Sequence, residues 1–352
     1  MVSYISPIDP HVHLRGEEYS NVKPSFLELG FRDAKEVGLI GVLEQPNPRP
    51  ELINRSRIKN RFQEVSAFSR GVYHGVHIGM TDNLDQVMET LFVVKNGDTG
   101  LNSDKTFYTH STGNMGILDH HMQRRIWEVK CRMDYYGVSI GHFEDEKEFV
   151  GEFDYTHPIS HSERQTPESE LVQVERQIRN ASDAGFKGVF YIAHVSNPDT
   201  VDYIDSMKEN LPFRVVLEAT FHHMFLNTSD YEIHGNRVKM NPPLRSPEIQ
   251  EKILEYVLAG KFDVIGTDHA PHTLEKKDSD NPPSGIPALP FWPKGIELLR
   301  REGIQEDLLE RLIFHNSDEI FKLGLVPKQI NRNYNPDLWN AYGYNPFSRI
   351  DK

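Results

Sequence analysis

Short apolar runs alternate with amphipathic stretches along most of this 352-residue chain. The runs rich in β-branched and aromatic residues predict strands at Ser3–His13, Leu39–Glu44, Val72–Ile78, Ser103–Tyr108, Val138–His142, Gly188–His194, Arg214–Ala219 and Phe262–Asp268. Helical patterns fall between most of them, at Ser25–Val37, Ile53–Phe68, Leu84–Lys95, Leu118–Tyr136, Pro167–Ala184, Asp199–Glu209, Pro247–Leu258 and Lys294–Arg301. Such alternation predicts an α/β fold with a parallel sheet, and eight units favour a closed (β/α)8 TIM barrel over an open, doubly wound sheet.

We expect a single barrel domain over residues 1–325 and a C-terminal tail over 326–352, packed on or beside the barrel as an irregular surface segment. Three long connections follow the carboxyl ends of predicted strands, the side on which barrels build active sites. These connections, expected as loops, are Glu144–Gln165, Phe221–Arg245 and Ala270–Pro293. Loops of this length in a compact domain are usually lids or binding segments.

Charge and composition exclude several classes of function. The net charge of −13 argues against a general nucleic-acid or anionic-membrane surface, while leaving room for a local basic pocket. We expect no membrane span and no signal peptide. A single cysteine, Cys131, excludes an intramolecular disulfide and predicts a cytoplasmic protein. No glycine-rich nucleotide motif follows a strand, and the 17 histidines are a weak hint of metal chemistry.

The first predicted strand ends in Asp9-Pro-His-Val-His-Leu-Arg15. Side chains alternate between the two faces of a strand, so His11, His13 and Arg15 point the same way. Two imidazoles on one face can bind one cation. Alone, however, this spacing is also compatible with two unrelated polar residues at the end of a strand.

Other strands end in ionisable residues as well: Lys105 lies in the fourth, and His142, His194 and Asp268 end later ones. A barrel brings these ends to one cavity, so the combination predicts a metal site, although a lone buried histidine is more often part of the core. Nearby positive charge would drive the amine of Lys105 neutral. A neutral amine can add carbon dioxide and become an anionic carbamate that bridges two metals; the alternative is a surface or salt-bridging lysine.

Several segments resemble dihydroorotase, a cyclic amidohydrolase of the amidohydrolase superfamily, in the order of that family. They are Asp9-Pro-His-Val-His-Leu-Arg15, Lys105-Thr-Phe with Ser111-Thr-Gly-Asn-Met, Gly141-His-Phe-Glu-Asp-Glu, Lys239-Met-Asn-Pro-Pro-Leu-Arg245 and Gly266-Thr-Asp-His-Ala-Pro-His-Thr. The first and the last are highly specific to the family. The resemblance covers residues 9–290 and implies a (β/α)8 barrel with two zinc ions.

The resemblance also implies a ligand set and a reaction. One metal falls to His11, His13 and Asp268, the other to His142 and His194, and carboxylated Lys105 to both. The reaction is the reversible cyclisation of N-carbamoyl-L-aspartate to L-dihydroorotate in pyrimidine biosynthesis. Opening a cyclic amide needs a nucleophile at neutral pH, which a metal supplies by lowering the pKa of water. Asp268 can then accept a proton and deliver it to the leaving nitrogen.

Four residues are expected to bind the substrate. Arg15 offers a planar guanidinium suited to a carboxylate. Asn47, Asn241 and His272 match substrate contacts of the family, although Asn beside Pro is also a common turn signal. The family's usual Met-Pro-Asn is replaced here by Gln45-Pro-Asn-Pro. Because the first motif begins at residue 9, we expect no N-terminal β-sandwich.

Two other functions stay open. A hydantoinase or allantoinase would share the histidines and the lysine, but its uncharged substrate would not require Arg15. An inactive homologue that serves as a scaffold for aspartate transcarbamoylase would typically lack metal ligands, and all six are present here. We expect a small-molecule substrate, with either a homodimer or association with aspartate transcarbamoylase.

Overall fold

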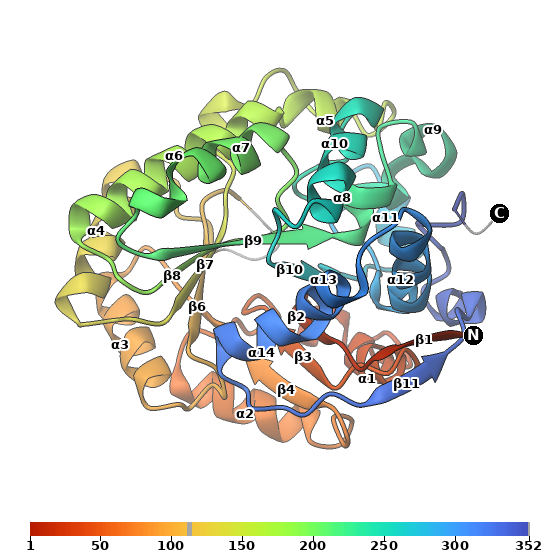
Figure 1. The fold of residues 1–352 in the computed structure, drawn as a ribbon, viewed down its shortest axis with the longest axis horizontal. Helices are drawn as coiled ribbons and strands as arrows, with labels where there is room; N and C mark the ends of the chain where they lie inside the picture. The colour runs from red at the N-terminus through yellow and green to blue at the C-terminus, as the bar shows by residue number, and fades with distance from the viewer. Residues whose placement is uncertain (111–114, 351–352) are drawn as a thin grey trace.

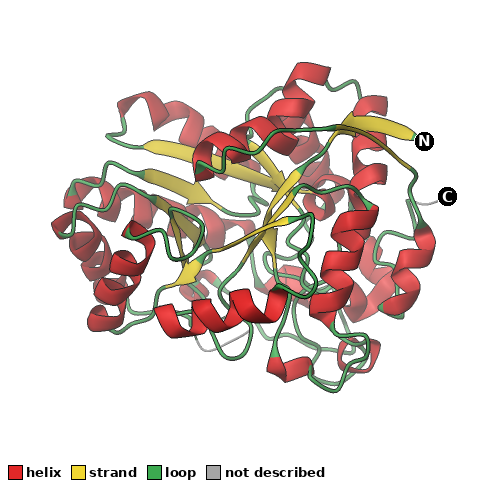
Figure 2. Ribbon diagram, turned by 90° about the horizontal axis from the view of Figure 1, so that it is seen from below, coloured by secondary structure: helices red, strands yellow, loops and turns green. Residues whose placement is uncertain are grey.

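The computed structural model describes residues 1–110 and 115–350. Its central strands are β2 (Ile8–Val12), β3 (Gly41–Glu44), β4 (Tyr73–Val76), β5 (Ile78–Gly79), β6 (Ser103–Phe107), β7 (Val138–His142), β8 (Val189–Ile192), β9 (Arg214–Thr220) and β10 (Val264–Gly266). All of their pairings are parallel, in one ladder from β2 to β4 and another from β5 to β10. The strands lie at the centre of the molecule with helices around them (Figure 1; Figure 2).

Hydrogen bonds join the two ladders into a closed barrel. β4 and β5 lie on either side of His77 and together form one strand of the barrel. The amide of His77 donates to Glu44 O of β3 at 2.9 Å, and Met80 N donates to Lys105 O of β6 at 2.9 Å. On the other side, His13 N donates to His269 O at 2.7 Å, beyond the end of β10. The expected (β/α)8 barrel is therefore confirmed.

Most of the long helices begin and end close to the expected positions. They are α1 (Phe26–Glu36), α2 (Arg55–Val65), α3 (Leu84–Lys95), α4 (His120–Arg132), α6 (Pro167–Ala184), α7 (Pro198–Met207), α10 (Pro247–Leu258) and α12 (Trp292–Arg301). Local capping explains several starts: Ser246 accepts a hydrogen bond from Ile249 N at the start of α10, directly before Pro247. Thr166 holds the expected N-cap position of α6, but its hydroxyl makes no capping bond.

Short helices interrupt the long connections, which the sequence predicted as loops. They are α5 (Ser160–Arg164), α8 (Phe221–Phe225), α9 (Asp230–His234) and α11 (Leu274–Lys277), and two more, α13 (Glu306–Glu310) and α14 (Asn316–Phe321), follow α12. Single turns of 3₁₀-helix lie at Glu17–Tyr19, Glu146–Glu148, Lys208–Asn210, Gly235–Val238, Leu289–Phe291 and Pro336–Ala341, with a π-turn at Arg311–His315. Segments this short carry too few periodic positions to be recognised from sequence.

The predicted strand Ser3–His13 is in fact two strands. β1 (Val2–Ile5) ends before Pro7, and β2 begins after it. β1 pairs antiparallel with β11 (Gln329–Arg332), outside the barrel. The sequence predicted one strand because the apolar pattern continues across Ser6 and Pro7, whereas Ser6 N donates to Lys328 O at 2.8 Å and turns the chain away from the barrel ladder.

The tail is more ordered than an irregular segment. Besides β11, it buries Trp339, and the hydroxyl of Tyr342 donates to Asp33 Oδ2 in α1 at 2.6 Å. The N- and C-terminal ends of the chain lie on the same side of the molecule (Figure 1; Figure 2). The division of the chain at residue 325 stays a prediction.

The helical layer packs on the barrel through aromatic side chains. Trp127 of α4 is 1% exposed and lies 5.0 Å from Phe186 and 5.6 Å from Phe190, measured between ring centroids. Phe190 in turn lies 5.7 Å from Phe213. A buried aromatic side chain contributes roughly 1.5–3 kcal/mol. This cluster holds α4 and the turn after α6 against β8, so that the strands can present their polar ends at one rim.

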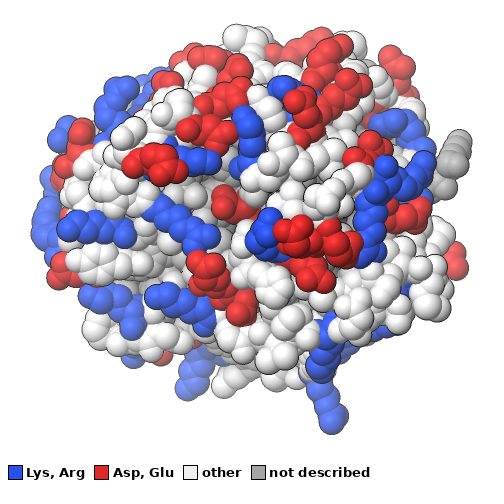
Figure 3. Space-filling view, viewed as in Figure 1, with Lys and Arg blue, Asp and Glu red and all other residues white. Residues whose placement is uncertain are grey.

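The molecular surface carries both signs of charge. On the face drawn in Figure 3, lysine and arginine side chains are interspersed with aspartate and glutamate, without a continuous basic tract. Among the described residues, no helix has both the length and the apolar character required to cross a bilayer.

Candidate metal centre

One cavity opens at the carboxyl ends of the barrel strands. It is lined by His11, His13, Arg15, Asn47, Lys105, Phe107, His142, His194, Asn241, Asp268, Ala270, Ser284 and Gly285. The cavity therefore brings together all six residues predicted as metal ligands and three of the four predicted to bind substrate. His272 is not among the lining residues.

His11, His13 and Asp268 form one buried cluster, whose possible ligand atoms all lie within 4.8 Å of one another. The Nδ1 atom of His11 is 2.8 Å from Glu218 Oε1, and that of His13 is 2.5 Å from Asn47 Oδ1. Both partners are acceptors, so each Nδ1 is placed to donate a proton, and each Nε2 is the ring nitrogen that faces Asp268. Both Nε2 atoms approach the same Asp268 Oδ1, at 3.2 Å and 3.0 Å.

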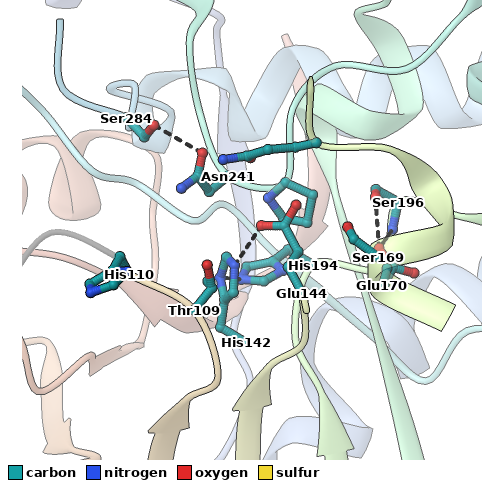
Figure 4. A network of polar contacts seen from close by, with 12 residues as sticks. Thr109, His110, His142, Glu144, Ser169, Glu170, His194, Ser196, Asn241 and Ser284 are labelled. Atoms are coloured by element: carbon teal, nitrogen blue, oxygen red, sulfur yellow. Dashed lines mark hydrogen bonds and ion pairs between the residues drawn. The ribbon is translucent and has the colours of Figure 1, made fainter. Parts of the chain in front are cut away.

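His142 and His194 form a second cluster across the cavity. His142 Nδ1 lies 3.0 Å from His194 Nε2, while His142 Nε2 faces Glu144 Oε2 at 2.8 Å (Figure 4). Glu144 thus fixes the proton on Nε2 and leaves Nδ1 free to bind a ligand. The rings of His11 and His194 are 5.3 Å apart between centroids, so the two clusters are neighbours.

Lys105 is completely buried in the cavity wall, and its Nζ has no hydrogen-bond partner among the described residues. Burial lowers the pKa of Lys105 to about 8, against the opposing charges of Glu218 and Asp268. A buried, unpartnered amine is costly. In its neutral form, this amine can react with carbon dioxide.

The protonation of the cluster suits a cation. Burial lowers the pKa of His13 to about 4, so its imidazole is neutral near pH 7. Burial would raise the pKa of Asp268, but the adjacent His11 and His13 side chains outweigh it and hold that pKa well below its usual range. Two Nε2 atoms directed at one carboxylate oxygen need protons or a positive ion between them and that oxygen. The donor set therefore fits a divalent metal.

The predicted substrate residues lie on the other side of the cavity. Arg15 Nε donates to Pro271 O at 3.0 Å, and Nη2 is 2.8 Å from His272 Nε2. His272 therefore lies behind Arg15 instead of facing the cavity, and its Nδ1 is hydrogen-bonded to the Tyr19 hydroxyl. Asn241 Oδ1 accepts a bond from Ser284 Oγ at 2.9 Å (Figure 4). It also accepts one from His161 Nε2 at 2.9 Å.

Three residues of the site adopt left-handed backbone conformations. Their φ angles are 60° at Arg15, 40° at His194 and 47° at Asp268. Such angles are uncommon for residues other than glycine, and they concentrate at functional sites where the surroundings enforce them. At Arg15 one enforcing contact is visible, since Arg61 Nη2 donates to the Arg15 carbonyl at 2.6 Å.

The sequence did not single out the carboxylates behind the histidines. Glu218 lies in β9 and is 1% exposed. It accepts bonds from His11, from the Tyr191 hydroxyl at 2.6 Å and from His194 N at 3.0 Å. A charged residue inside the apolar run Val215–Ala219 was the available signal. Glu144 had a signal too, because it lies two residues after His142 and so on the same side of the chain.

Two other buried histidines have both ring nitrogens hydrogen-bonded. His77 contacts Ser103 Oγ at 2.6 Å and Pro10 O at 3.1 Å, and His223 contacts Thr220 and Pro242 O. Within the motif Ser111-Thr-Gly-Asn-Met, residues 111–114 lie outside the described residues.

Comparison of sequences finds no matching family model but does find curated relatives. A dihydroorotase from Halobacterium salinarum is 32% identical over 290 residues, which make up 80% of this chain and 63% of that relative. A dihydroorotase from Methanosphaera stadtmanae is 29% identical over 346 residues, 94% of this chain and 73% of that protein. The chain thus spans less than two thirds of the length of the first of these relatives.

Solved structures share the fold. The L-hydantoinase (dihydropyrimidinase) from Arthrobacter aurescens matches with a TM-score of 0.76 and 20% identity, over 91% of this chain and 71% of that one. The dihydroorotase from Saccharomyces cerevisiae, in complex with 5-fluoroorotic acid, matches with a TM-score of 0.73 and 16% identity, over 91% and 85%. At these identities the likeness establishes the barrel architecture.

Proposed function

We propose that the chain is a cyclic amidohydrolase of the family that contains the dihydroorotases, and that it interconverts N-carbamoyl-L-aspartate and L-dihydroorotate. The observation that carries the proposal is the composition of the cavity. Imidazoles and a carboxylate converge on one side, and the guanidinium of Arg15 lies on the other. A substrate that combines a hydrolysable ring amide with a free carboxylate would engage both sides.

For the metal side, we propose two divalent ions, with zinc as the expected metal. His11, His13 and Asp268 would hold one ion, His142 and His194 the other, and Lys105 would bridge them as a carbamate. The unpartnered, fully buried Nζ of Lys105 supports the last assignment. The ions would supply an activated water and polarise the scissile carbonyl.

The chain's own groups would bind the substrate and move its proton. In the hydrolytic direction, a water oxygen adds to the ring carbonyl carbon, and the carbon–nitrogen bond of the ring breaks. Asp268 would accept the proton from the attacking water and deliver it to the departing nitrogen. Its lowered pKa keeps the carboxylate ionised before the step.

Recognition of the substrate falls to the opposite wall. Arg15 would bind the carboxylate with its guanidinium, and Asn241 would contact the ring. Asn47 would act partly through His13, whose ring it orients, and His272 would act through Arg15, which it contacts. Two of the four residues expected to bind the substrate would therefore also orient another side chain of the site.

Hydrolysis of another cyclic amide, as by a hydantoinase or allantoinase, is the second candidate, because hydantoinases share this fold. The buried guanidinium of Arg15 argues against it, since an uncharged hydantoin would leave that charge without a partner.

A direct assay separates these activities. Zinc-loaded protein should be tested side by side on carbamoyl aspartate, dihydroorotate, hydantoin and allantoin. The proposal expects turnover of the first two only, whereas preference for hydantoin or allantoin would favour the second candidate. Failure of the protein to retain zinc after loading, together with no turnover of any of the four substrates, would favour a scaffold.

A cytoplasmic location and assembly as a homodimer or with aspartate transcarbamoylase also stay proposals. Light scattering of the purified chain, alone and mixed with aspartate transcarbamoylase, tests the assembly.

A further inference from the structure

The connection between α11 and α12 brings a short segment, Pro282–Gly285, to the rim of the cavity. Ser284 and Gly285 of this segment line the cavity beside Arg15 and Asn241. Two lysines hold the segment from behind: Lys277, the last residue of α11, and Lys239.

Lys277 is fully buried, yet it has no carboxylate partner. Its Nζ donates to the carbonyl oxygens of Lys239 at 2.8 Å, Pro283 at 3.0 Å and Gly285 at 3.0 Å. Within residues 1–110 and 115–350, the ammonium makes no ion pair. Three acceptors match the three hydrogens of an ammonium, whereas a neutral amine would turn its lone pair toward a carbonyl oxygen.

Lys239 binds the same segment from the other side. Its Nζ donates to Pro282 O at 3.0 Å and to Ser284 Oγ at 3.0 Å, and lies 4.9 Å from the centroid of the Phe153 ring. Ser284 connects Lys239 to the cavity wall, because Ser284 Oγ donates to Asn241 Oδ1 at 2.9 Å (Figure 4). Gly285 N donates back to Lys239 O at 2.9 Å.

The segment is packed closely against Arg15. Gly285 has a φ of 128°, and a Cβ atom there would lie 2.6 Å from Ala270 O and 3.1 Å from Arg15 Nη2. A side chain at residue 285 would therefore displace the guanidinium or its neighbours. Arg15, Lys239 and Lys277 are buried or largely buried basic side chains that form no ion pair among the described residues, and burial lowers the pKa of all three.

We infer that Lys277, together with Lys239, is a positioning residue: the two ammonium groups clamp Pro282–Gly285 against Arg15 and Asn241. The clamp sets the shape and the positive charge of the end of the cavity that receives an anion. The clamp stands on the hydrogen bonds alone, while the identification of that anion as the substrate carboxylate rests on the proposed function.

Lys277→Met in the full-length, metal-loaded protein tests the clamp, with Lys252→Met as a control. Lys252 is an exposed lysine of α10 that pairs with Glu255, so the control makes the same change in net charge far from the cavity. The first readout is amide hydrogen exchange in peptides that cover residues 279–288, with peptides from β7 and β8 as internal references. The second is the change in KM and kcat for L-dihydroorotate.

We expect Lys277→Met to accelerate exchange over 279–288 by at least about tenfold, because the Gly285 and Ala288 amides lose the geometry of their bonds to Lys239 O and His269 Nδ1, while β7 and β8 stay protected. KM should rise by roughly tenfold with kcat changed less than about threefold, since binding geometry and not chemistry is altered. Lys252→Met should change neither readout.

Unchanged exchange over 279–288 would overturn the clamp, whatever the protein catalyses. Equal acceleration in β7 and β8 would reduce Lys277 to a residue of general stability and would also overturn it. Local acceleration with an unchanged KM would overturn the link to the anion end of the cavity. If Lys277→Met does not fold, Lys239→Met, which keeps all bonds of Lys277, decides by the same criteria. Absence of dihydroorotase activity in the wild type would contradict the proposed function, but the exchange measurement would still decide whether the clamp exists.

Discussion

Glu218→Gln is the most informative single substitution at the metal centre. Glu218 Oε1 accepts from His11 Nδ1 at 2.8 Å and from His194 N at 3.0 Å, and Oε2 accepts from the Tyr191 hydroxyl at 2.6 Å. An amide has the same shape and can keep its oxygen toward both histidines, while the Tyr191 hydroxyl rotates to accept from the new NH2 group. The substitution therefore removes the charge and little else.

The size of the effect follows from those three bonds. Charge-assisted hydrogen bonds are about twice as strong as neutral ones, so each bond should lose roughly 1 kcal/mol, or about 3 kcal/mol in unfolding free energy. A carboxylate that orients a metal-binding histidine typically contributes about 10–100-fold in metal affinity or activity. We expect Glu218→Gln to lower kcat/KM within that range and to release metal to a chelator more readily.

Glu170→Gln is the matched control. Glu170 is also buried, and it too accepts three bonds, from Ser196 N at 2.9 Å, Ser196 Oγ at 2.7 Å and Asn197 N at 3.2 Å. None of these donors is a predicted metal ligand. Denaturant unfolding should show a loss of stability in both variants, larger in Glu170→Gln because its new NH2 group must face a backbone N–H, and elemental analysis should show metal loss only in Glu218→Gln. Equal metal retention in the two variants would refute the role of Glu218.

Three further predictions test other parts of the site. Arg15→Met should raise KM for dihydroorotate strongly, with a loss of roughly 2–5 kcal/mol in transition-state binding, and should hardly affect an uncharged dihydropyrimidine; equal effects on both substrates would make Arg15 structural. Lys105→Ala should lower activity by orders of magnitude, with partial rescue by acetate or propionate and none of Lys105→Arg; full activity of Lys105→Ala would refute the bridge. Burial lowers the pKa of His77 to about 3 in the folded chain. On acidification the unfolded chain therefore protonates this imidazole at a higher pH than the folded chain does, and the free energy of unfolding falls as the pH falls from about 6.5 toward 3. His77→Gln should reduce the slope of unfolding free energy against pH in that window, by at most about 1.4 kcal/mol per pH unit; an unchanged slope would contradict the assignment.

The barrel and its polar rim could be predicted because both depend on local patterns. The alternation of strand and helix predicts the closed sheet, and the ends of parallel strands meet at one rim. His142 and His194 could therefore be placed together from the sequence although they are 52 positions apart. No contact between them had to be known in advance.

The remaining features depend on contacts that no local pattern carries. Glu218 reaches His11 because β9, β10 and β2 are neighbours around the closed barrel, a contact across 207 positions. β11 pairs with β1 across nearly the entire chain. His272 carries a family motif, yet its ring lies behind Arg15 because Tyr19 and Ser284 O hold it there. The role of Lys277 is equally invisible, since its partners are backbone carbonyls, which every residue has.

The most direct test of the whole account is a crystal structure of the zinc-loaded protein with L-dihydroorotate near neutral pH, measured at the zinc absorption edge. The account predicts anomalous density between His11, His13 and Asp268 and again beside His142 and His194, a carbamate on Lys105, and the substrate carboxylate against Arg15. A bare amine at Lys105 in active crystals, a single or absent metal peak, or a carboxylate bound away from Arg15 would contradict it.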